Sequence, residues 1–272
     1  MKRFEDLFPQ KPIIGMVHLR ALPGSPAYRG SMQEVIDWAL RDADALERGG
    51  VDGIMIENFF DAPFFQDQVG PETVAAMTRV VTLVRGRTQL PLGVNVLRND
   101  ALSALAIAAA CDCRFIRVNV LSWAMLTDQG VIEGKAAQVL RFRRLLGSDV
   151  LIFADCLVKH AISLAPQPME QAALDTWERG GADALIVSGL ATGRETNLDD
   201  VVAARRGAPE APVLIGSGVT QANIATLLSI ADGALVGTHF KQDGKVHNPV
   251  DTSRVQALVD IKRQSLSMNR VD

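Results

Sequence analysis

The chain is poor in cysteine and has no excess of basic residues. Its 272 residues include three cysteines, Cys111, Cys113 and Cys156, which are odd in number and show no CxxC spacing. This pattern disfavours both a disulfide framework and a structural zinc site, so we expect buried free thiols. The formal net charge of -3 at pH 7 leaves no basic surplus that would attract nucleic acid.

Long hydrophobic runs are also missing. The longest, residues 101–110, is too short to span a bilayer, and residues 1–8 lack the apolar core of a signal peptide. We therefore expect a cytoplasmic protein without a transmembrane segment. At 48% hydrophobic residues the chain can bury a substantial core, and no linker divides it. Residues 1–272 are expected to form a single domain.

A regular alternation of apolar runs and helical patterns predicts the fold. Strands are expected at residues 13–18, 53–58, 92–97, 115–119, 151–155, 184–188, 213–216 and 234–237. Helices are expected at 32–48, 71–85, 100–110, 134–146, 169–179, 198–206, 220–229 and 250–264. Eight strand–helix units in a chain of this length favour an α/β fold, the (β/α)8 or TIM barrel. A doubly wound open sheet is the alternative, but Gly15 and Gly24 are too far apart for a dinucleotide-binding turn.

The seventh and eighth expected strands both end in glycine. Gly216, Ser217 and Gly218 follow one of them, and Gly237 and Thr238 follow the other. In (β/α)8 barrels these two loops bind phosphate through backbone N–H groups, and glycine lets the backbone approach the oxygens. Thr220 is the expected N-cap of the next helix. The alternative is that the glycines serve turn geometry alone.

Polar residues occupy the upper ends of the first six strands. Side-chain alternation directs Asn95, Arg117 and Asn119 into the barrel, because the branched residues between them suit the outer, helix-packed face. The same alternation turns His18, Glu57, Asp155 and Ser188 inward. Burying so many polar groups near one axis is costly unless they pair or bind a ligand. A functional site is the more economical explanation.

The carboxylates are the main candidates for chemistry. Glu57 and Asp155 suit proton transfer or a divalent metal such as Mg²⁺, and the sequence does not separate these roles. His18 is a candidate general acid or base, or a histidine held by hydrogen bonds in a loop. The amides of Asn95 and Asn119 would orient hydroxyl groups of a ligand.

The cations of the site have alternative partners. Arg117 either contacts a ligand or neutralises Glu57 across the barrel mouth. No lysine falls inside an expected strand, which argues against a Schiff-base mechanism because that needs a desolvated amine in the barrel mouth. Lys241 and Lys159 lie in loops instead, where each could meet a phosphate as a point charge. For Lys241 the alternative is an ordinary exposed loop cation.

Two loops at this end of the barrel are unusual. Residues 59–65 contain four phenylalanines, which we expect to form a pocket wall, a lid or a contact between subunits of a homo-oligomer. Residues 121–134 combine apolar residues with Thr127, Asp128 and Gln129 and are a second candidate lid.

Several segments together resemble the BtpA family. They are GMVHL at 15–19, LPG at 22–24, DGIMIENF at 52–59, GVNVLRND at 93–100, FIRVN at 115–119, TDQG at 127–130 and VKHA at 158–161, with the two glycine turns. The resemblance covers nearly the whole chain and implies a barrel of the ribulose-phosphate-binding type. The family takes its name from a cyanobacterial protein needed for photosystem I accumulation, and an SgcQ-like branch accompanies sugar-uptake and kinase functions. It brings no well-established reaction.

These observations favour an enzyme that binds a phosphorylated small molecule. A sugar phosphate or a nucleoside-derived phosphate would suit the site, and isomerisation, epimerisation or lyase-type cleavage would suit its acids and bases. The alternative is a non-catalytic assembly or stabilising factor for a membrane complex such as photosystem I. A fold alone does not decide between these classes.

Overall fold

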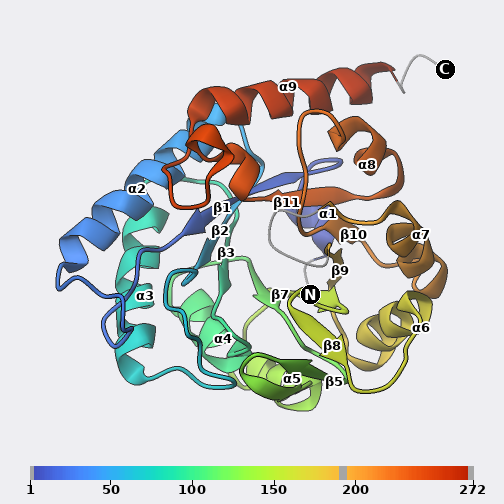
Figure 1. Cartoon of the computed structure of the whole chain (residues 1–272), viewed down its shortest axis with the longest axis horizontal. Helices are drawn as coiled ribbons and strands as arrows, with labels where there is room; N and C mark the ends of the chain where they lie inside the picture. Colours follow the sequence, from blue (N-terminus) through green and yellow to red (C-terminus); the bar gives the residue numbers. More distant parts are fainter. Residues whose placement is uncertain (1–2, 190–194, 269–272) are drawn as a thin grey trace.

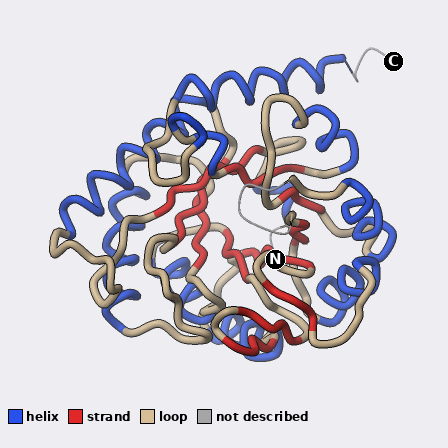
Figure 2. The backbone as a smooth tube through the Cα atoms, in the orientation of Figure 1, coloured by secondary structure: helices blue, strands red, loops and turns tan. Residues whose placement is uncertain are grey.

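The computed structural model describes residues 3–189 and 195–268, and within these ranges eight parallel strands close into a barrel. Their order around the barrel follows the chain, and the ring of strands lies inside a ring of helices (Figure 2). The strands are β1 (Ile13–His18), β2 (Gly53–Glu57), β3 (Leu92–Asn95), β4 (Phe115–Val118), β7 (Leu151–Cys156), β9 (Ala184–Val187), β10 (Val213–Ile215) and β11 (Gly233–Val236). The expected (β/α)8 barrel is confirmed.

The helices cover the outside of the barrel (Figure 1). They are α2 (Met32–Gly49), α3 (Pro71–Arg85), α4 (Ala101–Ala110), α5 (Ala136–Leu145), α6 (Met169–Leu174) with the π-helical turn η1 (Asp175–Arg179), α7 (Leu198–Gly207), α8 (Ile224–Ile230) and α9 (Thr252–Met268). Local signals explain two of the starts. The Ser31 side chain caps α2 by accepting from the Glu34 N–H at 3.2 Å, and α3 begins with proline at its first position.

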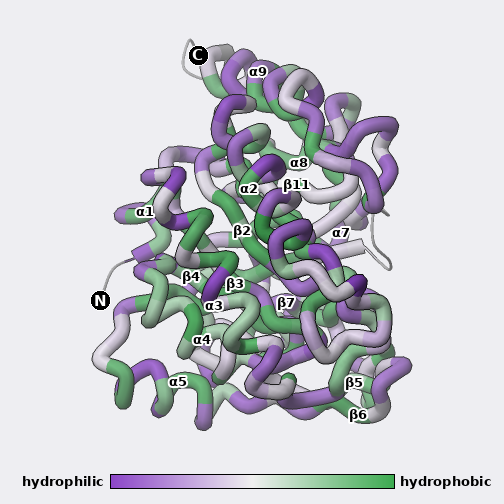
Figure 3. The backbone as a smooth tube through the Cα atoms, turned by 90° about the vertical axis from the view of Figure 1, so that its left-hand side faces the viewer, coloured by the Kyte–Doolittle hydropathy of each residue, from purple (hydrophilic) through white to green (hydrophobic). Residues whose placement is uncertain are grey.

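Side-chain alternation along the strands divides the core into two clusters. One residue set, including Ile14, Met55, Phe115 and Phe153, fills the barrel interior, and the other packs the barrel against its helices. A short helix α1 (Phe4–Leu7) brings Phe4 into the interior cluster. The outer helices α5 and α9 alternate between hydrophilic and hydrophobic along their turns, as a helix with one buried face requires (Figure 3).

A small antiparallel sheet replaces the loop that we expected at residues 121–134. Strands β5 (Ala124–Thr127) and β6 (Gly130–Glu133) form a hairpin, and β8 (Ala161–Ser163) pairs with β5 on its other side. Met125 and Ile132 point inward and pack with Val120 and Val158, which explains why these residues form strands. The opposite face of this sheet carries exposed apolar side chains, among them Leu126 and Ile162.

Two further expectations concern thiols and membranes. Cys111, Cys113 and Cys156 are all free and buried, as expected. Burial raises the pKa of the Cys156 thiol to about 12, so it is not an activated thiolate. Among the helices of the described ranges, we find none that combines the length and the apolarity needed to cross a membrane.

Candidate functional site

The inward-facing residues at the carboxyl ends of β1, β2 and β3 form one connected group. His18 and Glu57 are register partners on neighbouring strands, and Glu57 and Asn95 are the next pair around the barrel. Asn95 Nδ2 donates to Glu57 Oε2 at 2.5 Å, and His18 Nε2 lies 4.0 Å from Glu57 Oε1. The side-chain directions predicted for these residues therefore agree with the structure, and Asn95 holds the Glu57 carboxylate in place.

Arg117 pairs with Asp155 and not with Glu57. Arg117 Nε and Nη2 donate to the two carboxylate oxygens of Asp155 at 2.8 and 2.7 Å, and both side chains are buried. Their strands β4 and β7 are neighbours in the barrel, whereas β2 is separated from β4 by β3. Burial alone lowers the pKa of Arg117, but the Asp155 carboxylate raises it more, so Arg117 stays charged.

Asp155 is therefore the counter-ion of Arg117, and its role in proton transfer or metal binding stays a prediction. Asn119 Nδ2 and Ser188 Oγ also donate to it, each at 3.2 Å. A cavity opens at the barrel mouth, and Glu57 and Arg117 line it. It is not lined by Asp155, Asn119, Ser188 or Asn95. These four residues, predicted as catalytic or substrate-binding, support the groups that do face the cavity.

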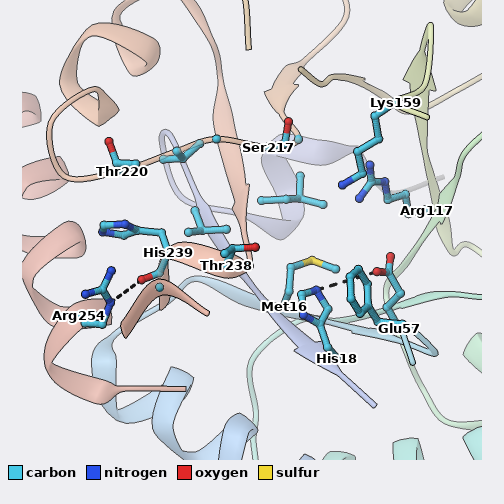
Figure 4. A pocket seen from close by; sticks show the side chains of 18 residues that line it. Met16, His18, Glu57, Arg117, Lys159, Ser217, Thr220, Thr238, His239 and Arg254 are labelled. Carbon is cyan, nitrogen blue, oxygen red and sulfur yellow. Dashed lines mark hydrogen bonds and ion pairs between the residues drawn. The ribbon is translucent and has the colours of Figure 1, made fainter. Parts of the chain in front are cut away.

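That cavity has a volume of about 200 Å³ and lies at the carboxyl ends of the strands (Figure 4). Acid–base groups and the glycine loops after β10 and β11 both line it. Glu57, Arg117 and Lys159 are together at one end, whereas Thr220, His239 and Arg254 are at the other (Figure 4). A single small molecule can therefore contact both groups.

The glycines after β10 and β11 occupy crowded positions: a side chain does not fit at Gly216 and would be tight at Gly237. A Cβ atom on Gly216 would lie 2.3 Å from Ser188 Oγ, and one on Gly237 would lie 3.1 Å from His18 Cε1. These loops also offer hydrogen-bond donors. Within the described ranges, the backbone N–H groups of Gly218, Val219, Thr238 and His239 donate to no protein acceptor, although these residues line the cavity. Such groups normally find a partner in water or a ligand.

The cation near the glycine loops is Arg254, which the sequence analysis did not identify. Arg254 lies on α9, and its Nε donates to the His239 carbonyl at 2.7 Å. His239 adds a ring nitrogen, Nε2, that is buried and has no hydrogen-bond partner in the described part of the chain. Burial and the charge of Arg254 lower the pKa of His239. No local signal marked Arg254, because only the packing of α9 turns it toward the barrel mouth.

Lys241 does not reach the cavity, so its predicted phosphate contact is wrong. Lys241 Nζ donates to Asp42 Oδ2 at 2.7 Å, and both side chains are fully buried. Asp42 also accepts from the Val250 N–H at 3.0 Å. The pair thus joins α2 to the segment before α9.

Thr220 is not an N-cap, because α8 starts at Ile224 and its N-cap is Asn223. Thr220 instead lines the cavity.

Lys159 is in the cavity, although it follows β7 in a loop. Its backbone carbonyl accepts from Arg98 Nη2 at 2.7 Å, which fixes the loop, and its side chain points toward Arg117 (Figure 4). Burial, and next the charge of Arg117, lower the pKa of Lys159 to about 8. The argument against a Schiff base, that no desolvated amine lies in the barrel mouth, is therefore wrong.

His18 sits under an aromatic ring and stays neutral. Phe59, from the aromatic loop, stacks on it with ring centroids 4.4 Å apart. Burial is the main reason that the pKa of His18 lies well below its ordinary value, and the charges of Lys241, Lys159 and Arg117 lower it further. A neutral imidazole beside Glu57 can donate one hydrogen bond from one ring nitrogen and accept one at the other. Its Nδ1 is buried without a partner in the described ranges.

The aromatic loop is covered mainly by its own neighbours. Phe60 stacks on His247 at 5.0 Å between centroids, and Phe59 is taken up by His18. Phe65 is the most exposed of the four, at 61%.

For metals, we find no group of at least three His, Cys, Asp or Glu side chains in residues 3–189 and 195–268 that could hold an ion.

The fold and the cavity define a (β/α)8 barrel with a polar site at the carboxyl ends of its strands. The chain belongs to the BtpA family, whose model matches residues 9–264. It is 47% identical to the photosystem I biogenesis protein BtpA of Synechocystis sp., over 98% of this chain and 93% of that protein. It is 35% identical to the putative sgc region protein SgcQ of Escherichia coli, over 92% and 94% of the two chains.

Solved structures share the fold at low sequence identity. Phosphoribosyl anthranilate isomerase from Thermococcus kodakaraensis superposes with a TM-score of 0.54 at 11% identity, covering 93% of this chain and 99% of that chain. At this identity the likeness supports the architecture.

Proposed function

We propose that this protein is an enzyme that binds a phosphorylated small molecule and carries out acid–base chemistry on it. The observation that carries the proposal is the division of one cavity into two ends. Unpartnered N–H groups of Gly218 and Thr238, with the cation of Arg254, suit a phosphate. Glu57 and His18 suit proton transfer at the other end.

A sugar phosphate is the substrate class that this division favours. Its phosphate would contact the loops after β10 and β11, which would leave its carbonyl and hydroxyl groups near Glu57 and Arg117. Isomerisation, epimerisation and lyase-type cleavage would all use a carboxylate base beside a carbonyl. The name of the structurally similar phosphoribosyl anthranilate isomerase describes an isomerase with a phosphorylated sugar in its substrate.

Ligand binding and chemistry can be tested together. Thermal unfolding with inorganic phosphate and a panel of pentose and hexose phosphates should show a rise in Tm, because a ligand that binds only the native state stabilises it. The same panel in D₂O, followed by ¹H NMR with and without Mg²⁺, should show exchange of a carbon-bound proton beside a carbonyl. Glu57→Gln should abolish exchange and keep the Tm shift, whereas Arg254→Met should weaken both. No Tm shift with any phosphate would overturn the proposal.

A second candidate function is a non-catalytic assembly factor for a membrane complex, such as photosystem I. The observation that favours it is an exposed apolar row on the small sheet, where Leu126 is 47% exposed, Ile162 is 72% exposed and the two are register partners. The name of the Synechocystis relative agrees with this candidate. In a host that lacks its own BtpA protein, Ile162→Lys should fail to restore function if the surface is what matters, whereas Glu57→Gln should fail if chemistry matters.

A further inference from the structure

The lysines of this chain differ sharply in what they contact. In the described ranges, all but two donate to an oxygen of the protein: Lys11 to Ala231, Lys135 to Asp67, Lys241 to Asp42 and Lys262 to Asp52. The remaining two are Lys245, which is exposed in a loop, and Lys159, which lines the cavity. Lys159 Nζ makes no hydrogen bond and no ion pair within 4.0 Å in this part of the chain. It is therefore a partly buried amine without a partner in the described ranges.

The position of Lys159 does not suit a phosphate cation. Its side chain stands with Arg117 and Glu57, at the end of the cavity opposite Thr220, His239 and Arg254 (Figure 4). A second positive charge beside Arg117 is unfavourable, and Asp155 already binds Arg117 through both oxygens. Burial together with the charge of Arg117 lowers the pKa of Lys159 to about 8. A substantial fraction of the amine is then neutral near pH 7.5, and the neutral amine is the nucleophilic form.

We propose that Lys159 is the nucleophile of this site and forms an imine with the carbonyl group of a phosphorylated aldehyde or ketone. This proposal rests on the proposed function, because the phosphate subsite would hold the carbonyl carbon near Nζ. The backbone contact from Arg98 to the Lys159 carbonyl fixes the loop that carries the amine. Glu57, on the same cavity wall, is the acid and base of the reaction.

The chemistry balances without any further reactant. Neutral Lys159 Nζ adds to the carbonyl carbon and forms a C–N bond, while the carbonyl π electrons move to oxygen. That oxygen takes up two protons through Glu57, one of which the amine nitrogen has released, and leaves as water. The net consumption is one proton for each protonated imine that forms. The electron pair of a neighbouring C–H or C–C bond then moves toward the imine nitrogen and forms an enamine. When a C–H bond breaks, the released proton goes to Glu57; when a C–C bond breaks, the hydroxyl group on the departing carbon gives its proton to Glu57 and a neutral carbonyl fragment leaves. Glu57 then returns a proton to the enamine carbon, and addition of water to the resulting imine frees the amine and a carbonyl product.

Reductive trapping tests this directly. The protein is incubated with dihydroxyacetone phosphate or glyceraldehyde 3-phosphate and sodium cyanoborohydride, and the adducts are located by peptide mass mapping. We expect the adduct at Lys159, at a rate at least about tenfold above that at Lys245, because an amine of lowered pKa has far more neutral form at pH 7.5. Dihydroxyacetone without phosphate should label Lys159 much more slowly. Lys159→Met should lose the adduct, and Lys245→Met should keep it.

An independent measurement gives the protonation of the amine itself. Reductive methylation with ¹³C-formaldehyde, followed by NMR titration, should show the Lys159 signal titrating near pH 8, and Lys159→Met should remove that signal. Equal labelling at Lys159 and Lys245, or no adduct at Lys159 with either triose phosphate, would overturn the assignment. If Lys159→Met and the wild type both keep a phosphate-induced rise in Tm while neither forms an adduct, the proposed phosphate site stands and the imine fails. If phosphate gives no Tm shift, the proposed function fails as well.

Discussion

The guanidinium of Arg117 and the carboxylate of Asp155 form a two-point ion pair inside the barrel, with N–O distances of 2.8 and 2.7 Å. Both side chains are almost completely buried, and Asn119 and Ser188 complete the hydrogen bonds of the carboxylate. The pair fixes Arg117 at the wall of the cavity. It also gives the two carboxylates of the site different tasks, since Glu57 alone faces the cavity.

The first prediction follows from that difference. Asp155→Asn should cost about 3–5 kcal/mol of unfolding free energy, because it leaves the Arg117 charge buried without a counter-ion. Glu57→Gln should cost about 1 kcal/mol or less, since the amide keeps the shape and can still bond to Asn95. Urea unfolding with linear extrapolation measures both changes. Equal stability of the two variants would contradict the assignment of Asp155 as the counter-ion of Arg117.

The second prediction concerns the buried pair between Lys241 and Asp42. Asp42→Ala should destabilise the protein by about 3–5 kcal/mol, because Lys241 would remain charged and unpaired in a fully buried position. The matched control is Asp260→Ala, which breaks the exposed pair between Asp260 and Arg263 and should cost less than about 1 kcal/mol. A Tm shift of similar size in both variants would argue against a tight pair at Lys241.

Arg254 and Lys241 should differ in their effects on ligand binding, which is the third prediction. Arg254→Met should weaken phosphate binding by roughly tenfold or more, the value of one hydrogen bond to a charged group. Lys241→Met should leave the affinity of the folded protein for phosphate unchanged, because its ammonium group contacts Asp42. Calorimetric titration with inorganic phosphate gives both values. The opposite ranking would restore Lys241 as the phosphate ligand.

The fourth prediction is a loss of stability in mild acid that depends on His18. The folded protein holds the pKa of His18 well below its ordinary value of 6.5, mainly through burial and next through the charges of Lys241, Lys159 and Arg117. The unfolded chain therefore binds more protons as the pH falls below about 6.5, and stability decreases there. Above this pH both states are neutral at His18 and the contribution is complete.

Unfolding free energies measured from pH 7.5 to 5 check this dependence. His18→Gln should make the decrease with falling pH smaller, although the variant has its own packing cost. The exposed His247 supplies the control, because His247→Gln should leave the slope as in the wild type. An unchanged slope in His18→Gln would show that other groups cause the acid sensitivity.

Self-association, the fifth prediction, should involve the small sheet more than the aromatic loop. We expect a homo-oligomer, and the row formed by Val131, Leu126 and Ile162 offers a larger exposed apolar surface than Phe65 does alone. Light scattering at micromolar concentration should show that Ile162→Lys shifts the protein toward monomer and that Phe65→Ser has less effect. A wild type that is monomeric throughout would contradict the prediction.

The local sequence determined the eight barrel strands and the directions of many of their side chains, but not the small sheet of β5, β6 and β8. Each of the eight expected strands coincides with a barrel strand to within two residues at either end. The inward orientation of Glu57, Asn95 and Arg117 followed as well. Both outcomes depend on short-range rules, because a strand turns successive side chains to opposite faces and glycine-bounded apolar runs end where the barrel ends.

Only the tertiary structure decided which of these groups meet. The partner of Arg117 depends on which strands are neighbours in the closed barrel, and Lys241 and Asp42 are far apart along the chain. Arg254 reaches the cavity because of the way α9 packs on the barrel. The desolvation of Lys159 depends on the side chains that pack around its loop. These properties arise from contacts between distant segments and from the exclusion of water. A local pattern of residues specifies neither the distant contacts nor the exclusion of water. The same lysine side chain is a solvated surface cation or a desolvated amine according to what packs around it.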